Sequence, residues 1–342
     1  MQVAQSARAR IVLARCIVVL VAGVSPVACS ESATAPLPSS AAAAVSASVG
    51  HPNGIVSSQI PLDATPWAVD ISTNGVVYVT QLFGNQVAVS DIKSRTINSR
   101  IGVGITPTAV AFAPNGRTAY VANQLDGALG VIDVATGVET ATIQLPNGAA
   151  PFSVAVSPDG TQIFIASNQT SVFVADASTL AIVDAIPVGE APNAFALSPN
   201  GKHLFVSSFA GGTITELDIA SHAVVRTYVT GGTPQGLTTN KKGTELYVTF
   251  EEGFVVLFSV TTGTPLAALR LAAGGFGASV TPDDNHLYVT EPSVGLVQVI
   301  NLQNRTIKAA INVGGKPRRV AFNPTGRVAV VANEAGYITF IK

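Results

Sequence analysis

Short apolar runs separated by turn residues repeat along most of the chain. Residues 107–145 (PTAVAFAPNGRTAYVANQLDGALGVIDVATGVETATIQL) hold four such runs. Within each run Val, Ile, Ala and Tyr either alternate with polar residues or follow one another directly, and both patterns are typical of β-strands. We therefore expect these residues to form four short antiparallel strands.

The same four-run unit recurs at regular intervals. Each unit can be aligned on an anchor residue, usually Pro, that is followed nine residues later by a turn residue, and successive anchors are 41 to 44 residues apart. The anchors are Pro66, Pro107, Pro151, Pro192, Pro234, Phe276 and Pro317. The turn residues are Gly75, Gly116, Gly160, Gly201, Gly243, Asn285 and Gly326. Self-similarity at about 40–45 residues, with four strands per unit, is typical of the blades of a β-propeller.

Two kinds of turn residue divide each unit. The first and second strands of the early units are joined by Asn-Gly or Asp-Gly, which favours primed two-residue turns. These dipeptides are Asn74-Gly75, Asn115-Gly116, Asp159-Gly160 and Asn200-Gly201. The third strand of several units ends in an aspartate that would accept backbone N–H groups in an Asx-turn, so we interpret these carboxylates as structural. They are Asp91, Asp133, Asp176 and Asp218.

The last repeat stops one strand short at the C-terminus. Residues 54–62 (GIVSSQIPL) match the fourth strand of an earlier unit at 137–145 (GVETATIQL). They also precede Pro66 just as that strand precedes Pro151. The N-terminal strand 54–62 should therefore complete the last blade and close the ring, which removes the edges of an open array. We predict an all-β fold, a seven-bladed β-propeller of four-stranded antiparallel blades.

The residues before the repeats have the composition of an export signal and a linker. Three arginines precede a short apolar core at residues 17–24 (IVVLVAGV), which is below the roughly 18–20 residues needed to span a bilayer. We predict a signal peptide of the lipoprotein type at residues 1–29. Residues 30–50, rich in Ala, Ser and Pro, are expected to be a flexible linker, which leaves residues 51–342 for the propeller.

Both cysteines of the chain, Cys16 and Cys29, lie in this leader. Val27-Ala28-Cys29 resembles the end of a bacterial lipobox, in which the cysteine is lipidated and becomes the new N-terminus, although Pro26 stands where Leu is usual. We expect lipidation of Cys29, with ordinary secretion as the alternative. The exported domain would then contain neither a disulfide nor a thiol metal site.

Charge and hydropathy narrow the function classes. The formal net charge is -1 and 11% of the residues are charged, so the sequence offers no basic surface for nucleic acid. The mean hydropathy is high, +0.42, but it comes from Val, Ile and Ala alternating with Thr, Ser and Gly. That alternation is typical of sheets rather than of membrane helices.

The second strands of several units carry a recurring segment. It reads Tyr78-Val79-Thr80, Tyr120-Val121-Ala122-Asn123, Tyr247-Val248-Thr249 and Tyr288-Val289-Thr290. With the Asn-Gly turns, these segments resemble the YVTN-type β-propeller repeat of bacterial and archaeal surface and periplasmic proteins, including the YncE-like group. The resemblance covers residues 54–342 and implies a propeller with a binding or cell-surface role. More distant seven-bladed relatives include lactonases and the propeller subunits of amine dehydrogenases.

Strand direction predicts which loops share a face of the ring. The first strand runs away from the loop that enters its blade and the second strand returns, so the entry loops and the second-to-third-strand loops surround one mouth of the channel. We expect any ligand there. The predicted ligand-binding residues are Trp67, Asn123, Phe152, Asn193, Gln235, Glu291, Arg318, Asn333 and Glu334.

Aromatic and amide side chains dominate this mouth in the early blades, while acids lie beside Lys316, Arg318 and Arg319 in the last blades. Such a set suits a small polar ligand or a peptide, and aromatic loop tips suit a protein partner. The alternative is that Phe152 and Phe276 pack against neighbouring blades and that the charges form ordinary surface.

Catalytic chemistry has little support in the sequence. His203 and His286 occupy the same repeat column two blades apart, so we predict no metal site from them. A lactonase-like calcium site would use Glu and Asn side chains at the mouth, for which Glu291, Asn333 and Glu334 are available. No CxxCH haem motif and no Ser-His-Asp arrangement is evident.

We therefore predict an exported, lipid-anchored monomer in the periplasm or cell envelope that acts as a binding or scaffold module. Its partner would be a protein or a small polar ligand at the channel mouth, without a cofactor and without nucleic acid. A lactonase-like or other metal-assisted hydrolase, with calcium at the same mouth, is the alternative. A redox-accessory propeller is a third possibility and would need a partner subunit that carries the cofactor.

Overall fold

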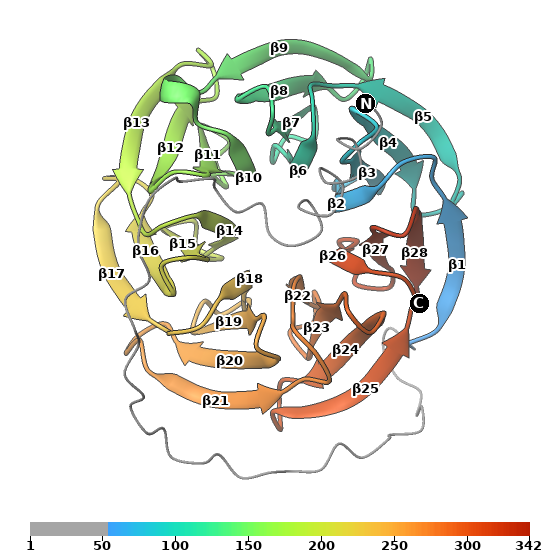
Figure 1. The fold of residues 1–342 in the computed structure, drawn as a ribbon, viewed down its shortest axis with the longest axis vertical. Coiled ribbons are helices and arrows are strands. Elements are labelled where there is room, and N and C mark those ends of the chain that lie inside the picture. The colour runs from blue at the N-terminus through green and yellow to red at the C-terminus, as the bar shows by residue number, and fades with distance from the viewer. Residues whose placement is uncertain (1–53) are drawn as a thin grey trace, which may run out of the picture. The chain divides into compact units, whose positions relative to one another are not determined.

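The computed structural model describes residues 54–342, which form seven four-stranded antiparallel sheets arranged as the blades of a ring (Figure 1). The predicted signal peptide, the linker and Cys29 lie outside the described residues. Within the described part, no helix is long and apolar enough to cross a membrane. The seven-bladed, all-β fold predicted from the repeats is confirmed.

The first three blades follow chain order from the ring axis outwards. Blade 1 comprises β2 (Pro66–Ile71), β3 (Val76–Gln81), β4 (Gln86–Asp91) and β5 (Ile97–Gly102). Blade 2 comprises β6 (Pro107–Phe112), β7 (Thr118–Asn123), β8 (Ala128–Asp133) and β9 (Val138–Gln144), followed by the short 3-10 helix η1 (Pro146–Gly148). Blade 3 comprises β10 (Pro151–Val156), β11 (Gln162–Ser167), β12 (Ser171–Asp176) and β13 (Ile182–Pro187).

The remaining blades repeat this order, except that the last one takes its outer strand from the N-terminus. Blade 4 comprises β14 (Pro192–Leu197), β15 (His203–Ser208), β16 (Thr213–Asp218) and β17 (Val224–Val229). Blade 5 comprises β18 (Pro234–Thr239), β19 (Glu245–Phe250), β20 (Phe254–Ser259) and β21 (Pro265–Arg270). Blade 6 comprises β22 (Ala278–Val280), β23 (His286–Glu291), β24 (Leu296–Asn301) and β25 (Thr306–Asn312). Blade 7 comprises β26 (Pro317–Phe322), β27 (Ala329–Asn333), β28 (Tyr337–Ile341) and β1 (Val56–Pro61).

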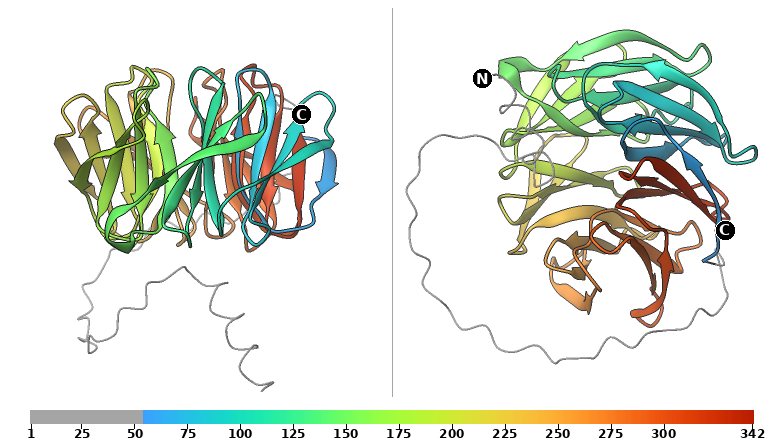
Figure 2. Two further views of the ribbon diagram at one scale, coloured as in Figure 1. Left: turned by 90° about the horizontal axis from the view of Figure 1, so that it is seen from above. Right: turned by 45° about the vertical axis from the view of Figure 1, so that its right-hand side comes forward.

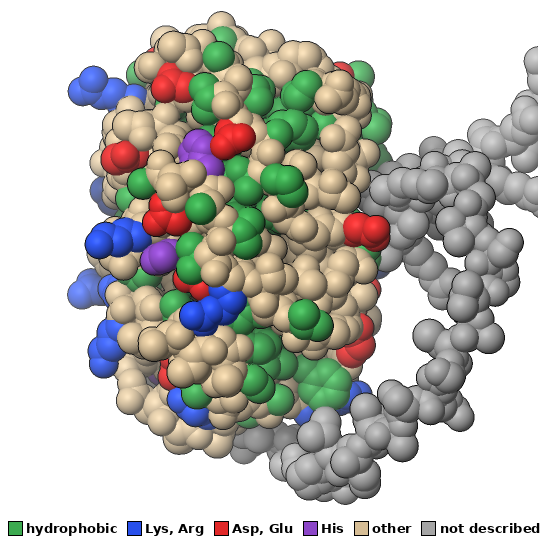
Figure 3. All heavy atoms as spheres, turned by 90° about the vertical axis from the view of Figure 1, so that its left-hand side faces the viewer, with side chains coloured by type: hydrophobic (Ala, Val, Ile, Leu, Met, Phe, Trp, Pro, Cys, Tyr) green, Lys and Arg blue, Asp and Glu red, His purple; other side chains and the backbone are tan. Residues whose placement is uncertain are grey.

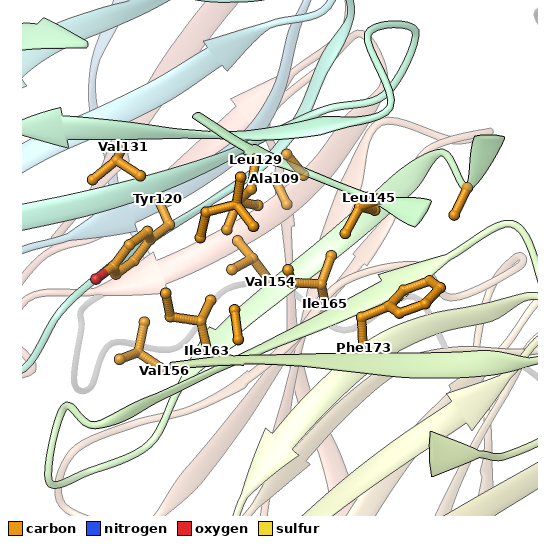
Figure 4. Packing of buried hydrophobic residues seen from close by; sticks show 14 of the residues in the cluster. Ala109, Tyr120, Leu129, Val131, Leu145, Val154, Val156, Ile163, Ile165 and Phe173 are labelled. Atoms are coloured by element: carbon orange, nitrogen blue, oxygen red, sulfur yellow. The ribbon is translucent and has the colours of Figure 1, made fainter. Parts of the chain in front are cut away.

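The core lies between the faces of adjacent blades, which are arranged side by side around the ring (Figure 2). Each neighbouring pair shares one cluster of buried apolar residues, and Figure 4 shows Tyr120 and Leu129 of blade 2 packed beside Val154 and Ile163 of blade 3. Because both faces of the middle strands are covered, these strands are almost continuously apolar. This explains why the runs in the sequence do not alternate strictly.

The outer strands instead alternate between exposed and covered positions, since only one side faces the core. In β17, for example, Val224 and Val229 are exposed whereas Tyr228 is buried. Figure 3 views the outer side of the ring that lies on the left in Figure 1, where β17 is found. It shows apolar side chains dispersed among polar and charged ones.

The ring is closed by antiparallel pairing of β1 with β28, in which Ile60 lies opposite Ile338. The pairing is extended by the Leu62 N–H, which donates to the Gly336 carbonyl at 2.8 Å. Leu62 is buried in the cluster between blades 7 and 1. The prediction that residues 54–62 complete the last blade is confirmed.

The hairpins between first and second strands differ from the prediction of primed two-residue turns. In blade 2 the Ala113 N–H donates to the Thr118 carbonyl and the Gly116 N–H donates to the Ala113 carbonyl, both at 2.8 Å, which leaves a four-residue loop. Asn115 keeps a negative φ and Gly116 has φ 65°. Pro114 therefore occupies the second position of an unprimed turn, where its fixed φ fits, and glycine supplies the left-handed residue that ends the turn.

The sixth repeat is displaced by one residue from the predicted alignment. Asp284, not Asn285, takes the place of the turn glycine, since its φ is 63° and its N–H donates to the Thr281 carbonyl at 2.8 Å. Gly275 is therefore the anchor of this repeat. Phe276 follows the anchor, in the position that Trp67 occupies in blade 1.

The aspartates at the ends of the third strands form the predicted Asx-turns. The Asp176 carboxylate accepts the Ser178 hydroxyl at 2.6 Å and the Thr179 N–H at 2.8 Å. These bonds lower the pKa of Asp176 to about 2. Asp133 accepts the Thr136 N–H at 2.7 Å in the same way. Their structural role is confirmed.

Deleting residues 54–62 should destabilise the domain strongly, because it removes the strand that closes the ring and uncovers the edge of β28. We expect the unfolding free energy to fall by at least about 3 kcal/mol, or roughly 6–12 °C in melting temperature for a domain of this size. Deleting residues 30–50 is the control and should leave the melting temperature unchanged. Equal melting temperatures for the two deletions would contradict the closing role of β1.

Candidate ligand site on the ring axis

The entry loops and the second-to-third-strand loops lie on one face of the ring, which we call the mouth face. In blade 1 the Leu82 N–H, just after β3, donates to the carbonyl of Thr65, just before β2, at 2.8 Å. In blade 2 the Gln124 N–H donates to the Thr106 carbonyl at 3.0 Å. The face predicted from strand direction is therefore correct.

A bulge near the start of the inner strands orients the side chains at this face. In β14 the register with β15 shifts between Pro192 and Ala194, and comparable shifts follow the first residue of five other inner strands. The Ala194 N–H in the bulge donates to the Ser207 hydroxyl at 3.0 Å. Bulges turn a side chain away from the regular alternation, and here they free the residue after the anchor from the blade faces.

The threonine of the Tyr-Val-Thr segments supports this bulge and the next blade. The Thr249 hydroxyl accepts the Gly236 N–H at 2.8 Å and donates to the Phe276 carbonyl at 2.9 Å. The Thr290 hydroxyl likewise accepts a backbone N–H and donates to the Arg318 carbonyl at 2.6 Å. The recurring segment thus has a structural role, which is to hold the backbone beside the ring axis.

Side chains from separate blades meet at the axis. Trp67 of blade 1 and Phe276 of blade 6 pack edge to face, with ring centroids 5.8 Å apart. Blade 7 lies between these two blades in the ring (Figure 1), so the two side chains can meet only by reaching inwards. The Arg318 guanidinium of blade 7 stacks on both rings, 4.5 Å from the Trp67 centroid and 4.8 Å from the Phe276 centroid.

Two further residues complete what we call the axial cluster: Trp67, Phe152, Phe276, Arg318 and Arg319. Phe152 reaches it from blade 3 and packs against the buried aromatic pair. The Arg319 guanidinium lies 4.9 Å from the Phe276 centroid. Phe152, Arg318 and Arg319 are half-buried, so the cluster combines a buried aromatic centre with partly exposed members. Such pairs of cation and aromatic ring attract each other.

One acid serves the cations of this cluster. Glu334 accepts two N–H groups of the Arg318 guanidinium, one of them at 2.7 Å, and its other oxygen lies 3.8 Å from the Lys316 ammonium. Arg319 forms no ion pair with any residue of the part described. Burial, together with the neighbouring Arg318 charge, lowers the pKa of Arg319 to about 10, so it remains cationic at neutral pH.

Amides occupy the equivalent positions of blades 4 and 5. The Asn193 side-chain N–H donates to the Gln235 amide oxygen at 2.6 Å, and the Gln235 side-chain N–H donates to a Glu251 carboxylate oxygen at 2.7 Å. Both amides are buried, whereas Glu251 is exposed. The predicted residues Trp67, Phe152, Asn193, Gln235 and Arg318 therefore share one ring of positions, each directly after its anchor.

Three other predicted residues support entry loops instead of joining the axial cluster. Asn333 accepts the Lys316 N–H at 2.7 Å and donates to the Gly314 carbonyl at 2.8 Å. Glu291 accepts the Ala273 N–H at 2.6 Å and is fully buried. Asn123 is buried against the entry loop of its own blade, at Gly104. These side chains end the second strands, where they face the loop that enters the same blade.

The candidate calcium ligands are thus engaged separately: Glu334 with arginine, Asn333 and Glu291 with backbone groups. Within residues 54–342, no group of three His, Cys, Asp or Glu side chains is placed to hold a metal ion.

Phe276 and Arg319 both carry the axial cluster, and the sequence places both in the entry loops, but neither is among the predicted ligand-binding residues. Aligning the sixth repeat on Phe276 moved this residue out of the column of Trp67. Arg319 could have been found from its column, because the equivalent residues of the other blades are all small. They are Ala68, Ala109, Ser153, Ala194, Gly236 and Gly277.

Comparisons with known proteins agree with the observed fold. A family model described as a YNCE-like beta-propeller matches residues 166–244. The solved structure of Kuenenia stuttgartiensis hydrazine synthase is similar, with a TM-score of 0.75 and 20% identity over 84% of this chain and 98% of that chain. At this identity the likeness concerns the fold alone. No curated protein matches the sequence.

Glu291 should make stability depend on pH. Burial raises the pKa of this carboxyl from 4.5 to about 7. The folded state therefore resists ionisation that the unfolded state undergoes, and stability is lost as the pH rises from about 4.5 through 7. Glu291→Gln removes this loss, so its stability relative to the wild type should increase by about 3 kcal/mol across that range.

Urea unfolding at pH 5 and pH 8 measures this difference. Glu190→Gln, which changes an exposed carboxyl on the mouth face, is the matched control. If the unfolding free energies of Glu291→Gln and the wild type differ by the same amount at both pH values, this pH dependence does not come from Glu291.

Proposed function

We propose that this chain, a YncE-like β-propeller, is a binding module of the cell envelope that takes a small ligand at the axial cluster. The propeller fold supports a binding or scaffold role in general. The observation that carries the finer proposal is the convergence of four side chains from four blades: Trp67, Phe152, Phe276 and Arg318.

The axial cluster differs from the other apolar clusters in a way that favours binding over packing. The other clusters each join two adjacent blades, whereas this one joins blades 1, 3, 6 and 7 across the ring. It also contains two guanidinium groups, which a purely structural contact between apolar residues does not require. Flat aromatic and guanidinium surfaces suit stacking with a planar or apolar ligand group.

The amides of blades 4 and 5 supply the polar part of such a site. Asn193 and Gln235 occupy the same repeat position as the axial residues and are linked to each other and to Glu251. A mainly apolar site with a few fixed polar groups is typical of small-molecule binding. A small polar ligand therefore fits this site better than a protein partner, whose contacts would spread over the loop tips.

The cellular location is proposed from the leader. A basic segment, a short apolar core and Val27-Ala28-Cys29 favour export followed by lipidation of Cys29. The alternative of a metal-assisted hydrolase is not favoured by a specific observation, because its candidate ligands Glu291 and Asn333 each bind backbone groups.

Ligand binding at the axis should change the emission of Trp67, which is the only tryptophan of the chain. We expect at least one class in a panel of small aromatic acids, amides and alcohols to quench this emission saturably. Phe152→Ala should weaken that binding about tenfold, since it removes one aromatic wall. Val183→Ala on the exposed outer strand β13 is the control. Equal affinity of both variants, or no saturable quenching by any compound, would contradict the proposal.

Cys29→Ala should release the protein from membranes. Removing the thiol prevents lipidation, and a single helical span is not available as a substitute in residues 54–342. The measurement is membrane fractionation of cells that produce the wild type or the variant, with Cys16→Ala as the control. Retention of Cys29→Ala in the membrane fraction would exclude the proposed anchor.

A further inference from the structure

Arg319 is the one large side chain in a column of small ones. The equivalent residue of every other blade is Ala, Ser or Gly, and Gly277 of blade 6 is packed tightly against the backbone of Arg318 and Arg319. Arg319 therefore brings into the axial cluster a charged group that the repeat itself does not need.

The surroundings of Arg319 offer it no counter-charge. Glu334, the acid that serves the cations of this cluster, is already bonded to Arg318 and lies near Lys316. No acidic side chain of residues 54–342 forms an ion pair with Arg319, which lies against the face of Phe276. A half-buried guanidinium without a counter-charge is partly desolvated without compensation, which is unfavourable. Its presence at the axis therefore calls for an anion from outside the chain.

A second group of the same cluster also lacks an acceptor. Trp67 is only 9% exposed, and its indole Nε1–H has no hydrogen-bond partner among the described residues. Buried N–H donors are nearly always paired in folded proteins. Trp67 and Arg319 contact the same Phe276 ring, so the cluster holds a buried N–H without an acceptor beside a guanidinium without a counter-charge.

We infer that the ligand of the axial cluster is a small carboxylate with an apolar or aromatic body, a conclusion that rests on the proposed function above. The carboxylate would bind Arg319 through paired N–H···O bonds, the geometry that guanidinium groups favour. The carboxylate oxygens have further lone pairs, which could accept the Trp67 N–H after a small adjustment of the side chains. The body of the ligand would lie against Phe152 and Phe276.

The charge balance favours a carboxylate over a phosphate. Of the cations near Glu334, Arg318 is paired with it directly, and the exposed Lys316 ammonium, 3.8 Å from the same carboxylate, is screened by solvent. This leaves Arg319 as the one partly buried cation of the axial cluster without a counter-charge. A monoanion matches this charge. A dianion would remain half-compensated and would face the Glu334 carboxylate as well, which is repulsive at short range.

The test compares phenylacetate with phenylacetamide, which has nearly the same shape but no charge, by quenching of Trp67 in the full-length protein. We expect phenylacetate to bind at least about tenfold more tightly, the effect of one charge-assisted hydrogen-bonded pair. Inorganic phosphate in the same titration should compete weakly or not at all. Equal affinity for the acid and the amide, or no saturable quenching by phenylacetate, overturns the inference.

Two arginine variants of blade 7 assign the effect to the proposed group. Arg319→Gln should remove the preference for the acid, whereas Arg327→Gln, on an exposed hairpin loop of the same blade, should keep it. Without ligand, Arg319→Gln should melt no lower than the wild type because it removes an uncompensated charge. A lower melting temperature with an unchanged preference would show a structural role and overturn the inference. If neutral compounds still quench Trp67 in that case, the proposed binding function stands.

Discussion

The pairing of β1 with β28 is the interaction on which the other features of the structure depend. It converts seven stacked blades into a closed ring, and only a closed ring places blade 1 beside blade 7. The contact of Trp67 with Arg318 joins these two blades at the axis. The axial cluster is therefore a product of closure as well as of the side chains that form it.

The architecture could be predicted from the sequence because its determinants are local and repeated. Each blade is specified by strand-forming runs and turn residues within about 45 residues. The last repeat lacks one strand and an extra strand precedes the first repeat, which indicates how the ring closes. The Asn-Gly dipeptides alone predict the wrong turn type, because Pro114, with its fixed φ, takes the second position of a longer, unprimed turn. The sixth repeat was misaligned by one residue because Asp284, a non-glycine residue, adopts the left-handed conformation there.

The candidate site could be predicted only in part, since contacts across the ring leave no trace in sequence spacing. Strand direction predicts the mouth face correctly, and five of the predicted ligand-binding residues there directly follow their anchors. Asn123, Glu291 and Asn333 lie at the same face, yet their side chains turn to the backbone of entry loops. That difference arises from the bulge in the inner strands, which frees one column of side chains, whereas the regular second strands keep theirs within the blade.

The assembly of blade 7 from both chain ends has a consequence for folding. The Ser57 hydroxyl donates to the Phe340 carbonyl, so partners in this blade are separated by 283 residues along the chain. Pairing at such a separation carries a high contact order and a large loop-closure entropy, and it is expected to be slow. During synthesis β1 is made before the other strands of the domain and β28 after them, so the ring can close only once β28 has been made.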